Sequence, residues 1–192
     1  MNFYWVGLDL GQAADFTALA VLEAVSAEGA ERELHLRYLE RYPLRTPYTT
    51  VAEGVVALVE QLRKLTVLRE EPDLLVDNTG VGRAVTDVLR DKGLHFKAIT
   101  LTGGSQVMRG KAGEYRVPKA DVVDALVVPF QSGALKVAAG LKLWSTLRAE
   151  LLNFRRKVNP ATAHASYEHW RESDHDDLVL AAALAAWGAQ RF

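Results

Sequence analysis

Three segments of the first 42 residues have the hydrophobic pattern and the length of β-strands. Residues 3–10 are almost continuously apolar, which predicts a strand near the centre of a sheet. Residues 16–25 are rich in alanine and β-forming residues, and residues 33–42 alternate between apolar and polar. Because short connections separate these segments, we expect an antiparallel meander of three strands.

The pattern changes in the middle of the chain. Apolar positions between residues 51 and 62 keep helical spacing, with Thr49 or Thr50 as the expected N-cap. Residues 74–77 then predict a strand, 82–92 a helix and 95–101 a strand, an order that requires a crossover and parallel pairing. Residues 102–116, rich in glycine and basic residues, predict a loop.

The remaining residues are mainly helical in pattern. We expect helices over residues 118–131, 141–157 and 176–189, and a short strand over residues 162–170. Three antiparallel strands, a helix and a strand–helix–strand unit follow one another in the order of the ribonuclease H-like α/β fold. That fold is a mixed sheet flanked by helices. With no repeat and no linker, residues 1–192 are expected to form a single domain of this class.

Composition narrows the classes of function. The 192 residues are 49% hydrophobic and 24% charged, which is typical of a globular protein. Lys plus Arg (23) nearly balances Asp plus Glu (24), so a nucleic-acid partner would have to meet a local basic face. No cysteine is present, which excludes disulfides, thiolate zinc sites and cysteine nucleophiles. Without a signal peptide or a convincing membrane span, we expect a cytoplasmic location and no membrane partner.

Carboxylates stand at three points where apolar segments end. Asp9 lies within the first strand, Asp77 ends a later strand, and Asp176 and Asp177 begin the last helix. Burying an unpaired charge costs roughly several kcal/mol, because the charge loses its hydration. A bound metal ion is one interpretation. Turn formation by Asp9 and helix capping by Asp176 and Asp177 are the structural alternatives, and both stay open.

The ribonuclease H-like order would bring these carboxylates together, because Asp9 and Asp77 then lie on neighbouring strands. Divalent cations relieve the repulsion between converging carboxylates, and ligation by oxygen alone suits Mg²⁺ or Mn²⁺. Two such ions, roughly 4 Å apart, stabilise both oxygens of an in-line phosphoryl displacement. The acidic residues therefore predict phosphodiester hydrolysis. Asp176 and Asp177 point about 100° apart on a regular helix, so the sequence leaves open which of them is the primary ligand.

Two groups of basic residues could contact nucleic acid. Each could equally be a solvated surface, and neither suggests base-specific recognition. The candidate phosphate contacts are Arg109, Lys111, Arg116, Lys119, Arg155 and Arg156.

Four motifs in order also resemble the nuclease domain of phage large terminases, the motor subunits that package viral DNA. They are Gly7-Leu8-Asp9-Leu10-Gly11 with Asp15 to Leu19, the run from Val76 to Gly82, Val117-Pro118-Lys119 with Ser132 to Leu135, and His175 to Ala185. The resemblance covers nearly the whole chain.

The resemblance implies a metal-dependent endonuclease that cleaves double-stranded DNA during packaging. Asp9, Asp77 and one or both of Asp176 and Asp177 would be its metal ligands. The implied partners are a terminase ATPase domain, the small terminase subunit and the portal. No ATPase domain is expected in this chain, because residues 104–112 depart from a phosphate-binding loop in spacing and carry Ala112 where Ser or Thr is required.

Other functions remain open at this point. A junction resolvase would use the same ions on branched DNA, and a degenerate nuclease domain would serve as a DNA-binding or docking module. An actin-like ATP-binding protein also begins with a Gly-x-Asp-x-Gly strand, but it needs two such domains and a much longer chain.

Overall fold

The strands assemble into an eight-stranded sheet with the order β6-β7-β5-β4-β1-β2-β3-β8. The computed structural model describes residues 2–11, 15–25, 33–66, 71–80, 82–157 and 175–192. The strands are β1 (Asn2–Asp9), β2 (Ala18–Val25), β3 (Glu33–Arg41), β4 (Asp73–Asp77), β5 (Lys97–Thr102), β6 (Met108–Arg109), β7 (Glu114–Pro118) and β8 (Leu135–Val137).

The pairing of the strands confirms the expected mixed sheet. β1, β2 and β3 form an antiparallel meander, and β4 lies parallel to β1 on its other side. β5 returns parallel to β4 after the crossover through a helix. Three antiparallel strands followed by parallel ones, with helices on both faces, make up the ribonuclease H-like architecture predicted from the sequence.

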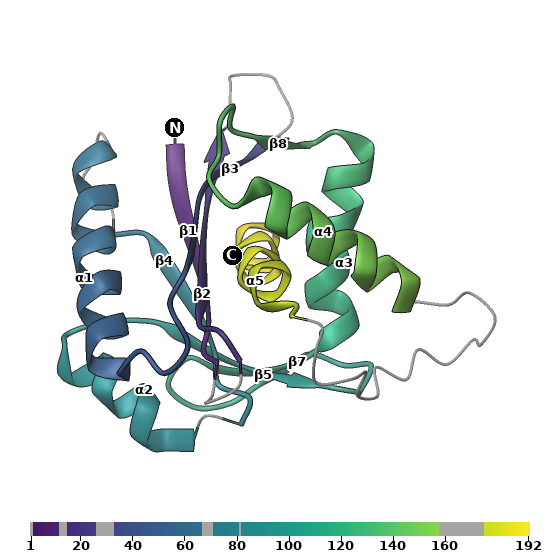
Figure 1. The fold of residues 1–192 in the computed structure, drawn as a ribbon. Helices are drawn as coiled ribbons and strands as arrows, with labels where there is room; N and C mark the ends of the chain where they lie inside the picture. The colour runs from purple at the N-terminus through teal and green to yellow at the C-terminus, as the bar shows by residue number, and fades with distance from the viewer. Residues whose placement is uncertain (1, 12–14, 26–32, 67–70, 81, 158–174) are drawn as a thin grey trace.

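Within the described residues, five helices cover the two faces of this sheet (Figure 1). α1 and α2 lie on one face, and α5 lies on the other, between the sheet and the pair formed by α3 and α4. Figure 1 shows α5 near the middle of the molecule. The helices are α1 (Tyr48–Leu65), α2 (Gly82–Asp91), α3 (Lys119–Ser132), α4 (Trp144–Lys157) and α5 (Asp177–Arg191). Among the described helices, none is both long and apolar enough to cross a bilayer.

α5 is buried along almost its whole length, from Asp177 to Ala189. Its residues are mainly alanine and leucine, so neighbouring backbones can approach it from several sides. The approach is closest at Gly7 of β1, where an added Cβ would lie 1.9 Å from the carbonyl oxygen of Ala181. Gly188 is similarly tight against Leu75 and Trp5. These contacts fix where α5 crosses β1, and so where it begins.

The structure corrects several expected boundaries. The segment 102–116 contains β6 and most of β7, which pairs with β5 at the edge of the sheet. β8, which pairs with β3, was also missed. α1 begins at Tyr48 after Pro47 as N-cap residue, with no side-chain cap, so the assignment of Thr49 or Thr50 was wrong. The strand expected over residues 162–170 lies outside the described residues.

Candidate functional site

Asp9 and Asp77 end two adjacent parallel strands on the same face of the sheet. β1 and β4 pair through Leu8 and Val76, so the next residue on each strand is an aspartate. Side chains alternate along a strand, and Trp5 and Leu75 belong to the core beneath α5. Asp9 and Asp77, separated from them by an even number of residues, therefore face α5 as well.

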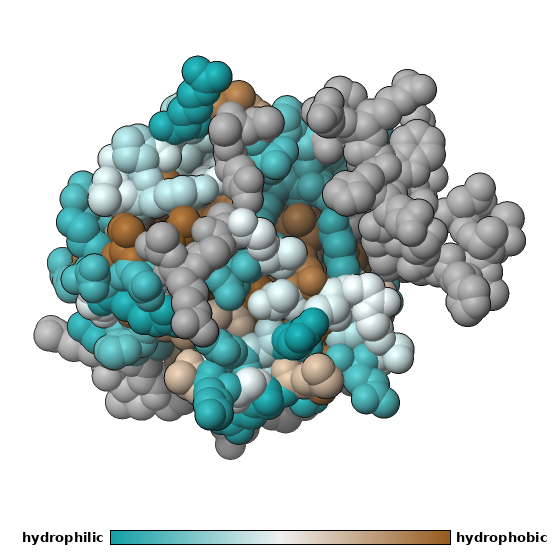
Figure 2. All heavy atoms as spheres, turned by 90° about the horizontal axis from the view of Figure 1, so that it is seen from below, coloured by the Kyte–Doolittle hydropathy of each residue, from teal (hydrophilic) through white to brown (hydrophobic). Residues whose placement is uncertain are grey.

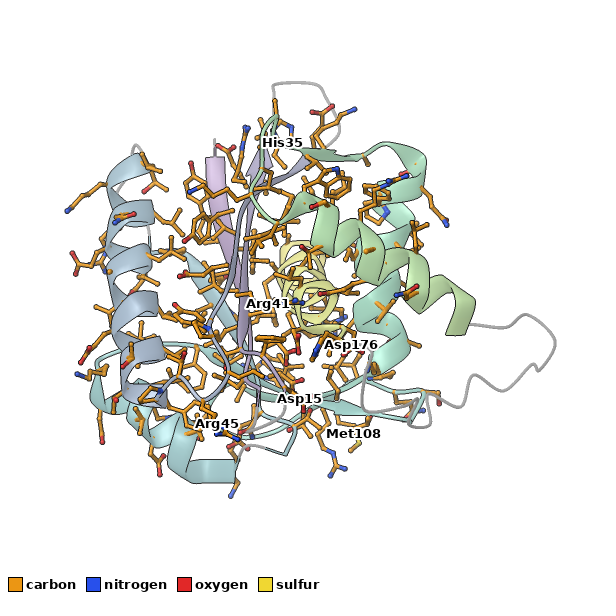
Figure 3. All side chains as sticks on the ribbon, in the orientation of Figure 1. Asp15, His35, Arg41, Arg45, Met108 and Asp176 are labelled. Carbon is orange, nitrogen blue, oxygen red and sulfur yellow. The ribbon has the colours of Figure 1, made fainter. Side chains whose placement is uncertain are left out.

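The beginning of α5 brings Asp176 and Asp177 to the same end of the sheet. Asp176 is the N-cap residue of α5 and Asp177 its first helical residue. Asp177 is buried, with 4% of its surface exposed, against 9% for Asp9 and 6% for Asp77. Figure 3 shows Asp176, Asp15 and Met108 at this end of the molecule, whereas His35 lies at the opposite end. The four predicted carboxylates thus lie at the same end of the sheet, near enough to affect one another electrostatically.

The carboxylates perturb one another electrostatically. Burial, followed by the charges of Asp77, Asp177 and Asp176, raises the pKa of the Asp9 carboxyl well above its usual range, although Lys119 opposes this effect. Nearby negative charges favour the protonated, neutral form of Asp9 unless a cation binds between the carboxylates.

Asp77 is also held by a local turn. Its Oδ1 accepts a 2.7 Å hydrogen bond from the backbone N–H of Thr79, and the Thr79 hydroxyl accepts one of 2.8 Å from the N–H of Leu101. Burial raises the pKa of Asp77, while the hydrogen bonds from Thr79 and the charge of Lys119 lower it. The turn fixes the orientation of the Asp77 carboxylate, which still lies among other acidic side chains.

Lys119 lies beside the acidic residues, a position that the sequence did not indicate. The sequence placed it among residues that contact DNA, but α3 begins beside the carboxylates and directs Lys119 toward them. Its Nζ lies 3.3 Å from Oδ2 of Asp176, and its charge lowers the pKa of both Asp9 and Asp77. Lys119 is therefore part of the acidic site.

Two further charged residues at the site were not identified from the sequence. Arg41, at the end of β3, forms an ion pair with Glu150 of α4 and lies 3.4 Å from Oδ2 of Asp177. Burial raises the pKa of Glu150 to about 7 and that of Asp177 to about 6, and in both cases the nearby Arg41 partly offsets the rise. No local pattern connects these residues, because Arg41 and Glu150 are 109 positions apart.

Asp15 and His175 stand around the acidic residues. Asp15 is exposed, and its charge raises the pKa of Asp177. The His175 ring packs edge-on against Phe16 at 4.7 Å, and its Nδ1 lies 3.8 Å from Oδ2 of Asp177. Both residues are near enough to influence the site electrostatically.

Arginines line an open hollow beside the site. The hollow has a volume of about 870 Å³ and begins at Asn78, the residue after Asp77. Its basic lining residues are Arg90, Arg109 and Arg116, and its acidic ones are Asp87 and Glu114.

The other predicted contacts to DNA are less well placed by the structure. Lys111 is exposed in the turn between β6 and β7 and does not line the hollow. The side chains of Arg155 and Arg156 lie outside the described residues. Figure 2 views this end of the molecule and shows hydrophilic side chains over most of it, with hydrophobic ones visible between them near the centre.

The donor set fits a hard divalent cation. All four candidate ligands are carboxylates, the oxygen donors that Mg²⁺ and Mn²⁺ prefer. Oδ2 of Asp177 is buried and accepts no hydrogen bond from the described residues. As the described side chains stand, no three acidic or histidine groups are gathered closely enough to hold an ion together. The ion pairs of Asp176 with Lys119 and of Asp177 with Arg41 are consistent with this spacing, because each holds a carboxylate toward a basic residue.

Comparison with family models and with curated proteins finds no match for this chain. Solved structures do resemble it. The large terminase nuclease from thermophilic phage G20c, with bound zinc, has a TM-score of 0.60 and 20% identity over 96% of this chain and 80% of that one. The human cytomegalovirus terminase nuclease domain, soaked with Mn and with an inhibitor bound, has a TM-score of 0.62 and 17% identity over 97% and 82% of the two chains. The chain therefore has the fold of viral terminase nuclease domains, as its motifs predicted.

Proposed function

We propose that this chain is a divalent-metal-dependent endonuclease that cleaves double-stranded DNA, and that it acts in viral genome packaging. The observation that carries the proposal is that Asp9, Asp77, Asp176 and Asp177 lie at one end of the sheet and interact electrostatically. Carboxylates from two strands and a helix start, three of them buried, have a combined negative charge that Lys119 and Arg41 do not balance. A site of this kind stabilises a bound cation.

Mg²⁺ or Mn²⁺ held by these carboxylates would polarise a phosphodiester and lower the pKa of a water molecule that attacks it. The protein's own contribution is to orient the ligands. The turn at Thr79 directs Asp77, and the close approach of α5 to Gly7 sets Asp176 and Asp177 against Asp9. Lys119 reduces the repulsion among the carboxylates and lies where it can contact a phosphate of the substrate.

The arginines of the hollow support DNA as the substrate. Arg90, Arg109 and Arg116 would meet the phosphates of a strand that leaves the carboxylates past Asn78. Guanidinium groups suit phosphate oxygens, and contacts of this type carry no sequence information. We therefore expect cleavage with little sequence preference.

The role in packaging rests on the likeness to terminase nucleases in motifs and fold. If it holds, an ATPase domain, a small terminase subunit and a portal would restrain and position this nuclease. An isolated chain would then cleave slowly and without preference for a site.

The test is a cleavage assay of the purified chain. Supercoiled plasmid, several linear duplexes and a four-way junction would be incubated with Mn²⁺, Mg²⁺ or EDTA, and Asp9→Asn would be compared with wild type. We expect metal-dependent nicking and linearisation of all duplexes by wild type and none by Asp9→Asn.

Other results would redirect the proposal. Cleavage confined to the junction would favour a resolvase, and DNA binding without cleavage in any metal would favour a docking module. Full activity in Asp9→Asn, with contaminating nuclease excluded, would refute the proposed site.

A further inference from the structure

The first turn of α5 is capped by a residue from another helix. Asp176, at the N-cap position, makes no side-chain cap hydrogen bond. Instead, Oε2 of Glu150 in α4 accepts hydrogen bonds from the backbone N–H groups of Leu178, at 3.1 Å, and Val179, at 3.2 Å. A buried carboxylate on these amides also complements the positive end of the helix dipole. Glu150 thus fixes the first turn of α5, which carries Asp177.

Arg41 connects this cap to the acidic site. Its Nη2 donates to Oε1 of Glu150 and lies 3.4 Å from Oδ2 of Asp177, so one nitrogen is shared between the two carboxylates. Glu150 has one oxygen on the helix and the other on Arg41. The three side chains form a continuous link from the backbone of α5 to the carboxylate of Asp177.

The surroundings of Arg41 keep it in place. Its guanidinium lies 4.8 Å above the ring of Phe16, and its side chain is only 16% exposed. Figure 3 shows Arg41 between the sheet and α5. The ring of Phe16 and the carboxylates of Glu150 and Asp177 together fix the orientation of the guanidinium. Its position is therefore defined before any ligand binds.

We propose that Arg41 and Glu150 are positioning residues for Asp177, and that their link sets the orientation in which Asp177 faces Asp9 and a divalent cation. This inference rests on the proposed function, because it takes Asp177 as a metal ligand. The proposal assigns neither residue a contact with substrate. Their effect on the reaction would pass through the carboxylate that they orient.

A role for Arg41 through its charge and a role in orienting Asp177 predict opposite changes in metal affinity when Arg41 is removed. A cationic side chain beside a cation site repels the incoming ion, so its loss through charge alone would tighten metal binding. If Arg41 instead orients a ligand, its loss weakens binding, as removal of outer-shell partners does by about 10–100-fold. The sign of the change therefore separates the two roles.

The experiment measures binding of Mn²⁺ alone to the full chain, by titration calorimetry and by the EPR signal of free Mn²⁺, without DNA. We expect Arg41→Met to weaken Mn²⁺ binding by about 10–100-fold. Arg41→Lys keeps the charge but not the planar fork, so it should remain clearly weaker than wild type. Glu150→Gln keeps an oxygen for the helix N–H groups but loses the ion pair, and should have a smaller effect. In cleavage, the variants should need more Mn²⁺ while their KM for DNA stays unchanged.

Arg37→Met is the matched control. Arg37 lies on the same strand and pairs with the buried Glu23 at 2.6 Å, but it borders the groove beside α1 on the other face of the sheet. Its loss should lower the thermal stability and leave Mn²⁺ affinity at the wild-type value. If Arg41→Met does not fold, Arg41→Met/Glu150→Gln removes both charges of the Arg41–Glu150 pair and should fold with the same weakened binding.

The possible outcomes are distinguishable. Unchanged or tighter Mn²⁺ binding in the folded Arg41 variants, or full recovery in Arg41→Lys, would overturn the positioning role while wild-type binding and cleavage uphold the nuclease. A wild-type chain that neither binds Mn²⁺ nor cleaves DNA would remove the proposed function, and this inference with it.

Discussion

β4 carries an aspartate at each end, and the two have opposite surroundings. Asp73 and Asp77 are on the same face of a five-residue strand. Asp73 forms an ion pair with Lys97 of the neighbouring strand β5 and remains partly exposed. Asp77 is buried beside Asp9 and Asp176, and the nearby lysine, Lys119, already forms an ion pair with Asp176. An aspartate therefore forms a stabilising ion pair at one end of β4, whereas at the other end it adds to a group of buried acids.

The difference shows how a structural carboxylate can be told from a candidate functional one. The charge of Asp73 is balanced by a single neighbour, Lys97, and no further cation is needed. Around Asp77 the acids outnumber the nearby basic groups, and burial raises several of their pKa values. Perturbed acids gathered in this way are typical of functional sites.

The strongest test of this comparison replaces each aspartate of β4 by asparagine. We expect Asp77→Asn to lower the single-turnover rate of plasmid cleavage by at least about 100-fold, the upper end of what loss of an outer-shell partner costs. Asp73→Asn removes a partly exposed ion pair that lies away from the acidic site, and should cleave nearly as fast as wild type. Similar losses in the two variants would mean that the ends of the strand are not functionally distinct.

A smaller effect is expected at the hollow beside Asp77. Arg109→Glu or Arg116→Glu should weaken duplex binding by about tenfold, because each removes a phosphate contact and adds a repulsive charge. The slope of log Kd against log salt should fall by roughly one for each lost contact. Lys64→Glu, on the exposed side of α1, makes the same charge change away from the hollow. A loss as large in Lys64→Glu would show that net charge, rather than this surface, governs binding.

The smallest effect concerns the metal-free protein and pH. Folding raises the pKa of Asp9 and Asp77, and raises that of Asp177 to about 6, so the folded chain holds protons that the unfolded chain has released. Stability from these acids is complete below about pH 4, the ordinary carboxyl range, and is lost as pH rises through their raised pKa values, which for Asp177 is about 6. Between these values the free energy of unfolding should fall on the order of 1 kcal/mol, or a few degrees in Tm. Urea titrations across pH would measure it.

Asp9→Asn provides the control for the pH dependence. It removes one coupled acid, so its stability should depend less steeply on pH than that of wild type. Asp73→Asn should keep the wild-type slope. Stability of the metal-free protein that rises between pH 4 and pH 6 would contradict the account of the acidic site.

Local pattern was sufficient to predict the long elements and to single out the carboxylates as candidates. The meander, the crossover and the last helix have periodicity over many residues, and Asp9 and Asp77 contrast with their apolar neighbours. β7 and β8 were missed for physical reasons. β8 has three residues, too few for a period, and β7 owes its structure to pairing with β5 rather than to the glycine-rich segment around it.

The charged partners of the site could not be predicted in the same way. Arg41 resembled an ordinary residue at the end of a strand, and Glu150 one charge on a helix. Each acquires its role from packing that joins β3, α4 and α5. Lys119 was identified as basic, but only the start of α3 against the sheet shows that it faces acids rather than solvent.

The burial of α5 has a consequence for how the protein is made. α5 follows in sequence every strand that it covers, and ribosomes add residues at about 5–20 per second. Until α5 has emerged, the face of β1 and β2 that it covers lacks this helix. Asp9 and Asp77 also lack the carboxylates of Asp176 and Asp177 opposite them. If the chain is the nuclease proposed above, it would therefore be unable to cleave DNA before this stage. The order of synthesis itself would then delay the proposed activity until α5 has docked.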